Sequence, residues 1–124
     1  MVKSHVESEV RRGEQLLASA DEKARWQGAE LLGEFVETAP DLVWPVVACF
    51  GCSDDEDVRS AVATCILEHF LEQHFDRYFP ETEQLARDSL PFADTVSRCW
   101  AFGETELPQN RARFDALVQS TRTI

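Results

Sequence analysis

The chain has 124 residues, of which 12 are Lys or Arg and 23 are Asp or Glu, so its formal net charge is −11. A chain of this length usually forms one domain, and 44% hydrophobic residues suffice for a buried core. The negative charge argues against a protein that binds nucleic acid or an anionic membrane, because such binding requires Lys and Arg to neutralise phosphates.

The N-terminal segment lacks the pattern of a secretion signal. Glu7 and Glu9 lie where a signal peptide requires apolar residues, and no run of 18 apolar residues occurs that would span a membrane. Four cysteines are too few for a disulfide framework in a chain of this size. These observations predict a cytoplasmic protein with free thiols.

Helical periodicity extends over most of the chain. The only β-rich run, residues 42–47, contains Pro45, which disfavours a strand. Two capping boxes, at residues 19–22 and 53–56, and the five prolines divide the apolar stripes, with the prolines expected in linkers or first turns. The pattern predicts an all-α fold with helices at residues 3–18, 20–37, 41–50, 54–74, 80–90, 93–102 and 108–122.

The two capping boxes begin an internal repeat with an offset of 34 residues. The identical pairs at this offset are Ser19/Ser53, Asp21/Asp55, Glu22/Glu56, Arg25/Arg59, Ala29/Ala63 and Glu34/Glu68. After one inserted residue, Asp41 and Pro45 align with Asp76 and Pro80. Such a period is typical of helical repeat arrays. Coincidence between two amphipathic helices would explain the apolar matches, but not the shared cap, arginine and turn.

Residues 55–63, Asp-Glu-Asp-Val-Arg-Ser-Ala-Val-Ala, resemble the first helix of a HEAT repeat. The resemblance implies a short α-solenoid of about three helix pairs, in which Asp55 and Arg59, like Asp21 and Arg25 before them, help connect one repeat to the next. One helix pair cannot bury its apolar face alone, so pairs stack. The expected single domain, 1–124, comprises a capping helix (1–18), repeats at 19–52 and 53–90, and a degenerate third repeat or cap at 91–124.

Cys49, Cys52, Cys65 and His69 have the spacing C-x2-C-x12-C-x3-H, which is similar to that of zinc-binding motifs. Cys65 and His69 also lie on the apolar stripe of the predicted helix 54–74, and free cysteine is common in cores. We interpret these residues as packing residues and predict no metal or other cofactor. The chain has no nucleophile elbow, glycine-rich phosphate loop or His-Glu-x-x-His motif, so we predict no catalytic residues.

Candidate partner-binding residues are expected on the second helix of each pair, which would line the concave face. Most aromatic residues are interpreted as core, but Trp44, at the start of a short second helix, is the best candidate for an exposed anchor. Residues 54–106 hold 13 acidic and four basic residues, which indicates either a solvated surface or a face that steers a basic partner. The candidate binding residues are Asp41, Trp44, Asp76, Glu81, Glu83 and Asp88.

The sequence therefore favours a non-enzymatic protein-binding module, specifically an acidic inhibitor or immunity-type protein that occludes a basic protein. A generic adaptor, or a subunit of a larger assembly, has the same sequence features. A HEAT-like DNA-base glycosylase is a third hypothesis, but its substrate phosphates would meet an acidic face.

Overall fold

The computed structural model describes residues 2–122 and the side chains of residues 5–121. The elements are α1 (Val2–Leu17), α2 (Glu22–Gly33), α3 (Pro40–Phe50), α4 (Glu56–Val62), the π-helical turn η1 (Ala63–Leu67), α5 (Glu68–Gln73), α6 (Phe75–Asp88), α7 (Leu90–Ser97), the 3₁₀ turn η2 (Gly103–Glu106) and α8 (Pro108–Arg122). Since α4, η1 and α5 follow one another without a break, these residues form seven helices and no strand, which confirms the predicted all-α class.

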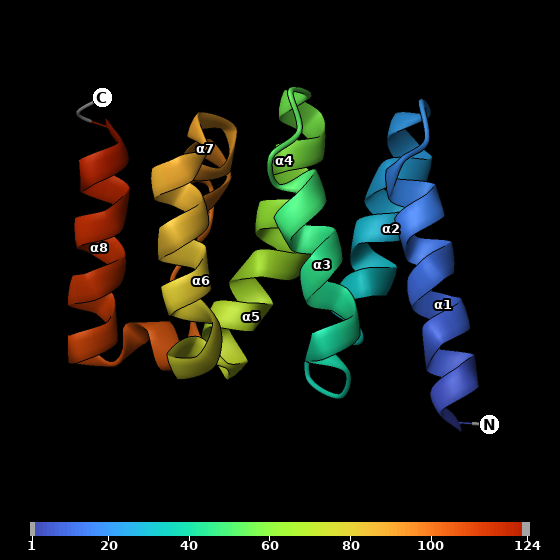
Figure 1. Cartoon of the computed structure of the whole chain (residues 1–124), viewed down its shortest axis with the longest axis horizontal. Coiled ribbons are helices and arrows are strands. Elements are labelled where there is room, and N and C mark those ends of the chain that lie inside the picture. Colours follow the sequence, from blue (N-terminus) through green and yellow to red (C-terminus); the bar gives the residue numbers. More distant parts are fainter. Residues whose placement is uncertain (1, 123–124) are drawn as a thin grey trace.

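The helices run alternately up and down and follow one another along the long axis of the molecule (Figure 1). They form two layers. In one layer, α2 and α7 both pack against α4 and η1. In the other, α1 contacts α3 and α6 contacts α8, while α3 meets α6 through Trp44 and Tyr78, whose ring centroids are 4.8 Å apart. The helices predicted to be the second of each pair, α3, α6 and α8, therefore share a layer.

The core between the layers consists of aliphatic and phenylalanine side chains from all parts of the chain. Phe70, Phe75, Phe79 and Phe92 are fully buried. Burial of each such ring stabilises the fold by about 1.5–3 kcal/mol relative to an exposed ring. The Phe75 and Phe79 rings stack 4.6 Å apart on α6. Over residues 2–122, no helix combines the length and the apolar character needed to cross a membrane.

Helices α1 and α2 approach closely at two glycines. A Cβ atom on Gly28 would lie 2.6 Å from both the carbonyl oxygen of Gly13 and the backbone nitrogen of Leu17. Only a residue without a side chain permits this distance between two helix backbones. The glycine pair thus sets how α1 packs on the rest of the molecule.

Two arginines at the repeat offset make equivalent contacts. Arg25 on α2 pairs with Asp57 on α4 at 2.9 Å, and Arg59 on α4 pairs with Asp94 on α7 at 2.8 Å. The same arginines donate to the carbonyl oxygens of Ser19 and Ser53, respectively. The two arginines thus connect successive helix pairs, as expected, and the acids that receive them are Asp57 and Asp94.

Asp21 and Asp55, which are expected to help connect the repeats, cap their own helices instead. Asp21 accepts a hydrogen bond from the backbone N–H of Ala24, and Asp55 accepts one from that of Asp57. The predicted capping boxes place the caps on the serines, which is wrong, because the Ser19 and Ser53 hydroxyls accept from the backbone N–H groups of Asp21 and Asp55. The helices consequently begin at residues 22 and 56.

Three further helix limits differ from the prediction. Helix α2 ends at Gly33 rather than at residue 37, and residues 34–38 form turns. Helix α6 begins at residue 75, so Pro80 lies inside it, at the position that Pro45 occupies inside α3. Helix α7 covers residues 90–97 instead of 93–102, because Ser89 caps it and the backbone N–H of Trp100 donates to the Glu68 carboxylate.

Candidate functional site

The predicted acidic residues of α6 are spread around its exposed side. Asp76 and Glu81 make no hydrogen bond or ion pair with any described residue, while Glu83 pairs with Arg87 at 3.4 Å and Asp88 accepts from Gln84 at 3.1 Å. At 100° per residue, Glu81 and Glu83 point toward opposite edges of that side. Helix α6 therefore provides a diffuse negative surface, of which Asp76 lines a hollow of about 400 Å³ beside Leu107 and Pro108.

Asp41 and Trp44 join α3 to α6. The Asp41 carboxylate accepts hydrogen bonds from the Arg77 guanidinium and, at 2.8 Å, from the Tyr78 hydroxyl. Burial, together with that bond, raises the pKa of Tyr78 to about 12. The Trp44 ring is partly buried against Phe70 and Tyr78, so its expected role as an exposed anchor is wrong.

The exposed tryptophan is Trp100 instead. Its side chain is 71% exposed, in the loop between α7 and η2. Neighbouring Phe102 is 45% exposed. From the sequence, both residues are interpreted as core residues. The residues next to them in the chain do not distinguish an exposed aromatic side chain in a loop from a buried one.

The candidate zinc ligands do not form a cluster. Among the described residues, no three His, Cys, Asp or Glu side chains are placed to bind one metal ion. Cys49 is an exposed free thiol on α3, whereas Cys65 lies on η1, where burial raises the pKa of its thiol and disfavours the thiolate that a metal needs. The His69 ring nitrogen Nδ1 lies 3.0 Å from the Glu72 carboxylate.

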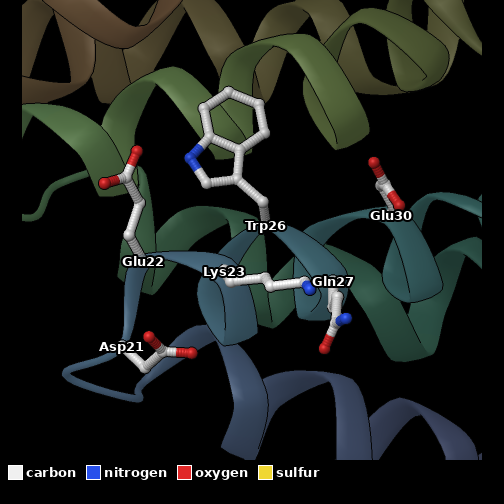
Figure 2. Close-up of a pocket in the computed structure, with 6 residues that line it drawn as sticks. All are labelled: Asp21, Glu22, Lys23, Trp26, Gln27 and Glu30. Carbon is white, nitrogen blue, oxygen red and sulfur yellow. The ribbon is translucent and has the colours of Figure 1, made fainter.

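A hollow of about 630 Å³ lies beside Trp26 on the exposed side of α2. Its lining residues are Asp21, Glu22, Lys23, Trp26, Gln27 and Glu30 (Figure 2). Figure 2 shows Glu22, Trp26 and Glu30 rising from α2 on the same side, toward the neighbouring helix, while Lys23 extends along α2 toward Gln27. This arrangement follows from the sequence, since residues four apart lie one above the other on a helix.

The Trp26 indole is held in place by a charged acceptor. Its Nε1–H group donates to both carboxylate oxygens of Asp57, at 3.0 and 3.2 Å, and Arg25 pairs with the same carboxylate. The hydrogen bond from Trp26, followed by that from Arg25, lowers the pKa of Asp57. Asp57 is thus ionised at neutral pH, and it fixes the orientation of the ring that borders the hollow.

A second hollow, of about 300 Å³, adjoins the first, because Glu30 lines both. Its other lining residues are Gly33, Glu34, Thr64, Cys65 and His69. We call the two hollows together the α2 groove. Glu22, Trp26, Glu30 and Glu34 follow one another along it, and Thr64, Cys65 and His69 form its opposite side in the second hollow.

The floor of the second hollow depends on a glycine and a π-helical turn. A Cβ atom on Gly33 would lie 2.2 Å from the carbonyl oxygen of Cys65, so the backbones of α2 and η1 touch there. Single π-helical turns inside α-helices are rare and occur frequently at functional sites. Because Thr64 and Cys65 of η1 line the second hollow, the α2 groove lies beside the one π-helical turn found in residues 2–122.

None of the groove residues of α2 is among the binding residues predicted from sequence. A signal for them does exist, because Glu22, Trp26, Glu30 and Glu34 follow one another at intervals of four. The interpretation of tryptophans as core concealed it. Only the packing of α2 against η1 reveals that this stripe borders an open groove.

Comparison with known proteins gives no relative: no protein-family model, curated protein or solved structure matches this chain. The function has to be argued from the chain's own residues.

Proposed function

We propose that this chain is a non-catalytic protein-binding module, a short HEAT-like helical array in the cytoplasm that binds and occludes a basic protein as an inhibitor or immunity protein does. One observation carries the proposal: the chain pairs its positive charges internally and leaves many of its negative charges toward solvent.

Most of the described arginines are used inside the molecule. Seven of them form ion pairs with acids of the chain, namely Arg12, Arg25, Arg59, Arg77, Arg87, Arg98 and Arg111. An eighth, Arg113, lies over the rings of Phe75 and Phe79. Little positive charge therefore remains to attract an acidic partner.

Many acids, in contrast, have no partner among the described residues. Glu22, Glu30 and Glu34 in the α2 groove, and Asp76 and Glu81 on α6, make no hydrogen bond or ion pair. Exposed ion pairs add little to stability. A surface with an excess of one charge sign, however, accelerates encounter with an oppositely charged protein and repels wrong partners. This charge distribution supports a basic partner.

The proposal is tested by immobilising the purified chain, passing over it a lysate of its native source at about 50 mM salt, and eluting with a salt step, because such contacts weaken as salt screens them. We expect one basic protein in the eluate, identified by mass spectrometry. Its isolated activity should fall in proportion to added chain, up to a 1:1 ratio. Retention of no basic protein, or of one whose activity is unchanged at saturation, contradicts an inhibitory role.

A second candidate, an adaptor or a subunit of a larger assembly, is favoured by the exposed Trp100 and Phe102 side chains. Exposed aromatic residues are typical anchors of protein interfaces. The two candidates differ in salt response, because an apolar interface persists at high salt. A partner that stays bound through the salt step and is lost in Trp100→Ala would support the adaptor.

A further inference from the structure

We infer that the α2 groove binds an extended, arginine-containing segment of the partner, with one guanidinium group against the Trp26 indole and between the carboxylates of Glu22 and Glu30. This assignment rests on the proposed function, because it names the part of a basic partner that is recognised and the place where it binds.

The side chains around Trp26 suit a guanidinium group. An indole attracts a cation to its face, and a planar guanidinium also stacks on it. Glu22 and Glu30 lie one helical turn before and after Trp26, so each carboxylate is about 6 Å along the helix from the ring's attachment point. Carboxylates bind the donors of a guanidinium in a fixed fork geometry, which an ammonium lacks. The pair of acids and the indole therefore select arginine over lysine.

The groove has the length for more than one side chain. From Glu22 to Glu34 it follows 12 residues of helix, about 18 Å. An extended peptide of five or six residues has the same length, at about 3.3 Å per residue. In such a peptide every second side chain points the same way, about 6.6 Å apart, close to the 6 Å between successive acids and Trp26 on α2. With one arginine at Trp26, between Glu22 and Glu30, the next two arginines at alternate positions would lie over Glu30 and Glu34 in turn.

Nothing in the described part of the chain occupies these groups. The carboxylates of Glu22, Glu30 and Glu34 make no internal hydrogen bond, and Lys23, which also lines the first hollow, extends along α2 toward Gln27 (Figure 2). The indole N–H group is already bonded to Asp57, and the ring is partly buried against the core, so the surface that it leaves open lines the hollow. The site is held in shape without a ligand, which lowers the entropic cost of binding.

The test uses an acetylated and amidated pentapeptide, Arg-Ala-Arg-Ala-Arg, titrated into the whole ¹⁵N-labelled chain by NMR. The three indole N–H signals report on three different places, and Trp26→Phe assigns the signal of Trp26. We expect that signal to move saturably, while those of Trp44 and Trp100 stay. The same peptide with citrulline, which is neutral and nearly the same shape, should leave all three signals unmoved. The lysine version should bind at least about threefold more weakly.

The matched variants are Glu22→Gln/Glu30→Gln, which removes two groove charges, and Glu37→Gln/Glu106→Gln, which removes two exposed charges elsewhere. All four positions are exposed, so both variants should fold. The groove variant should weaken the arginine peptide about fivefold or more, and the control variant less than about twofold. Equal weakening in both variants, equal affinity for the lysine peptide, or movement of other signals in place of Trp26 would each overturn the assignment.

Failure of this inference and failure of the proposed function give different results. A captured basic protein that binds wild type and Glu22→Gln/Glu30→Gln equally well overturns the groove and leaves the proposed function standing. Absence of any basic partner, together with an arginine peptide that moves no signal, overturns both.

Discussion

At the scale of single residues, Asp57 makes important contacts between helices, although it lies in the first turn of α4. It receives the guanidinium of Arg25 and the indole of Trp26, both from α2, and its own backbone N–H donates to Asp55. A single carboxylate thus ties two helices together and orients the ring that borders the α2 groove. Asp94 receives Arg59 and Arg98 in the next pair of helices, without a tryptophan.

Replacement of Asp57 by asparagine should lower the free energy of unfolding, because Arg25 loses its charge partner while the side chain keeps its size. Urea unfolding followed by circular dichroism measures the change. Asp54→Asn is the control, since Asp54 is exposed and makes no hydrogen bond or ion pair with a described residue. Equal midpoints for the two variants would show that the Asp57 contacts contribute nothing to stability.

The same carboxylates predict how stability depends on acid. Hydrogen bonds from Trp26 and Arg25 lower the pKa of Asp57; burial acts to raise that of Asp94, but bonds from Arg98 and Arg59 outweigh it and lower that pKa too. The stabilisation is complete above the ordinary carboxyl value of 3.8 and is lost as pH falls through the lower folded-state values. Unfolding free energies measured from about pH 6 to pH 2 should fall more steeply below that value for wild type than for Asp57→Asn/Asp94→Asn. Parallel curves would contradict the prediction.

The buried carboxyl group of Glu68 has the opposite effect on the dependence of stability on pH. Burial raises the pKa of its carboxyl above the ordinary value of 4.5, although the backbone N–H of Trp100 lowers it in part. The folded state therefore holds this proton to higher pH than the unfolded state, and ionisation of Glu68 reduces stability as pH rises above 4.5.

At the scale of helices, small residues and prolines decide where backbones meet and bend. Pro45 in α3 and Pro80 in α6 occupy equivalent positions inside their helices, as the 35-residue alignment of the two turns implies. Gly33 lets α2 touch the π-helical turn η1, and Gly28 lets α1 touch α2. These close contacts determine how α1, α2 and η1 pack against one another.

Replacement of Gly28 by alanine should therefore destabilise the protein by roughly 1–3 kcal/mol, because the new Cβ overlaps the backbone of α1. On helix propensity alone, the same change would stabilise by about 1 kcal/mol. Thermal and urea unfolding decide between the two signs. Gln27→Ala, at the exposed neighbouring position, controls for propensity, and a Gly28→Ala variant more stable than wild type would show that α1 shifts without cost.

At the scale of the whole molecule, the two kinds of charge have different surroundings. Most of the described arginines bind acids of the same chain, whereas many acidic side chains face solvent without a partner among the described residues. The acids of α6 and those of the α2 groove lie on different layers, so they have different expected effects on binding. Acids that a partner does not touch change its rate of arrival, whereas groups it contacts change its rate of departure.

Neutralisation of Glu81, Glu83 and Asp88 together should slow association with the proposed basic partner several-fold at low salt and flatten the dependence of that rate on salt. Stopped-flow measurements at several salt concentrations test this. Glu22→Gln/Glu30→Gln should instead mainly accelerate dissociation. An association rate that is unchanged in the α6 variant would remove α6 from the surface that attracts the partner.

Local patterns in the sequence determined the helical class, the number of helices, the 34-residue repeat and the two arginines that join successive helices. Each of these depends on residues close together in the chain, where periodicity, caps and prolines act directly. The limits of α2, α6 and α7 were less well predicted, because buried carboxylates and tertiary packing decide which backbone groups find partners there.

Tertiary structure alone decided which acids the arginines bind, which tryptophan is exposed, and that Glu22, Trp26, Glu30 and Glu34 border a groove. All three depend on side chains about 30 or more residues apart in sequence, whose meeting is set by the distance and angle between packed helices. An amphipathic stripe specifies that one side of a helix is buried. It does not specify which helix packs against that side, or where a groove remains between the two helices.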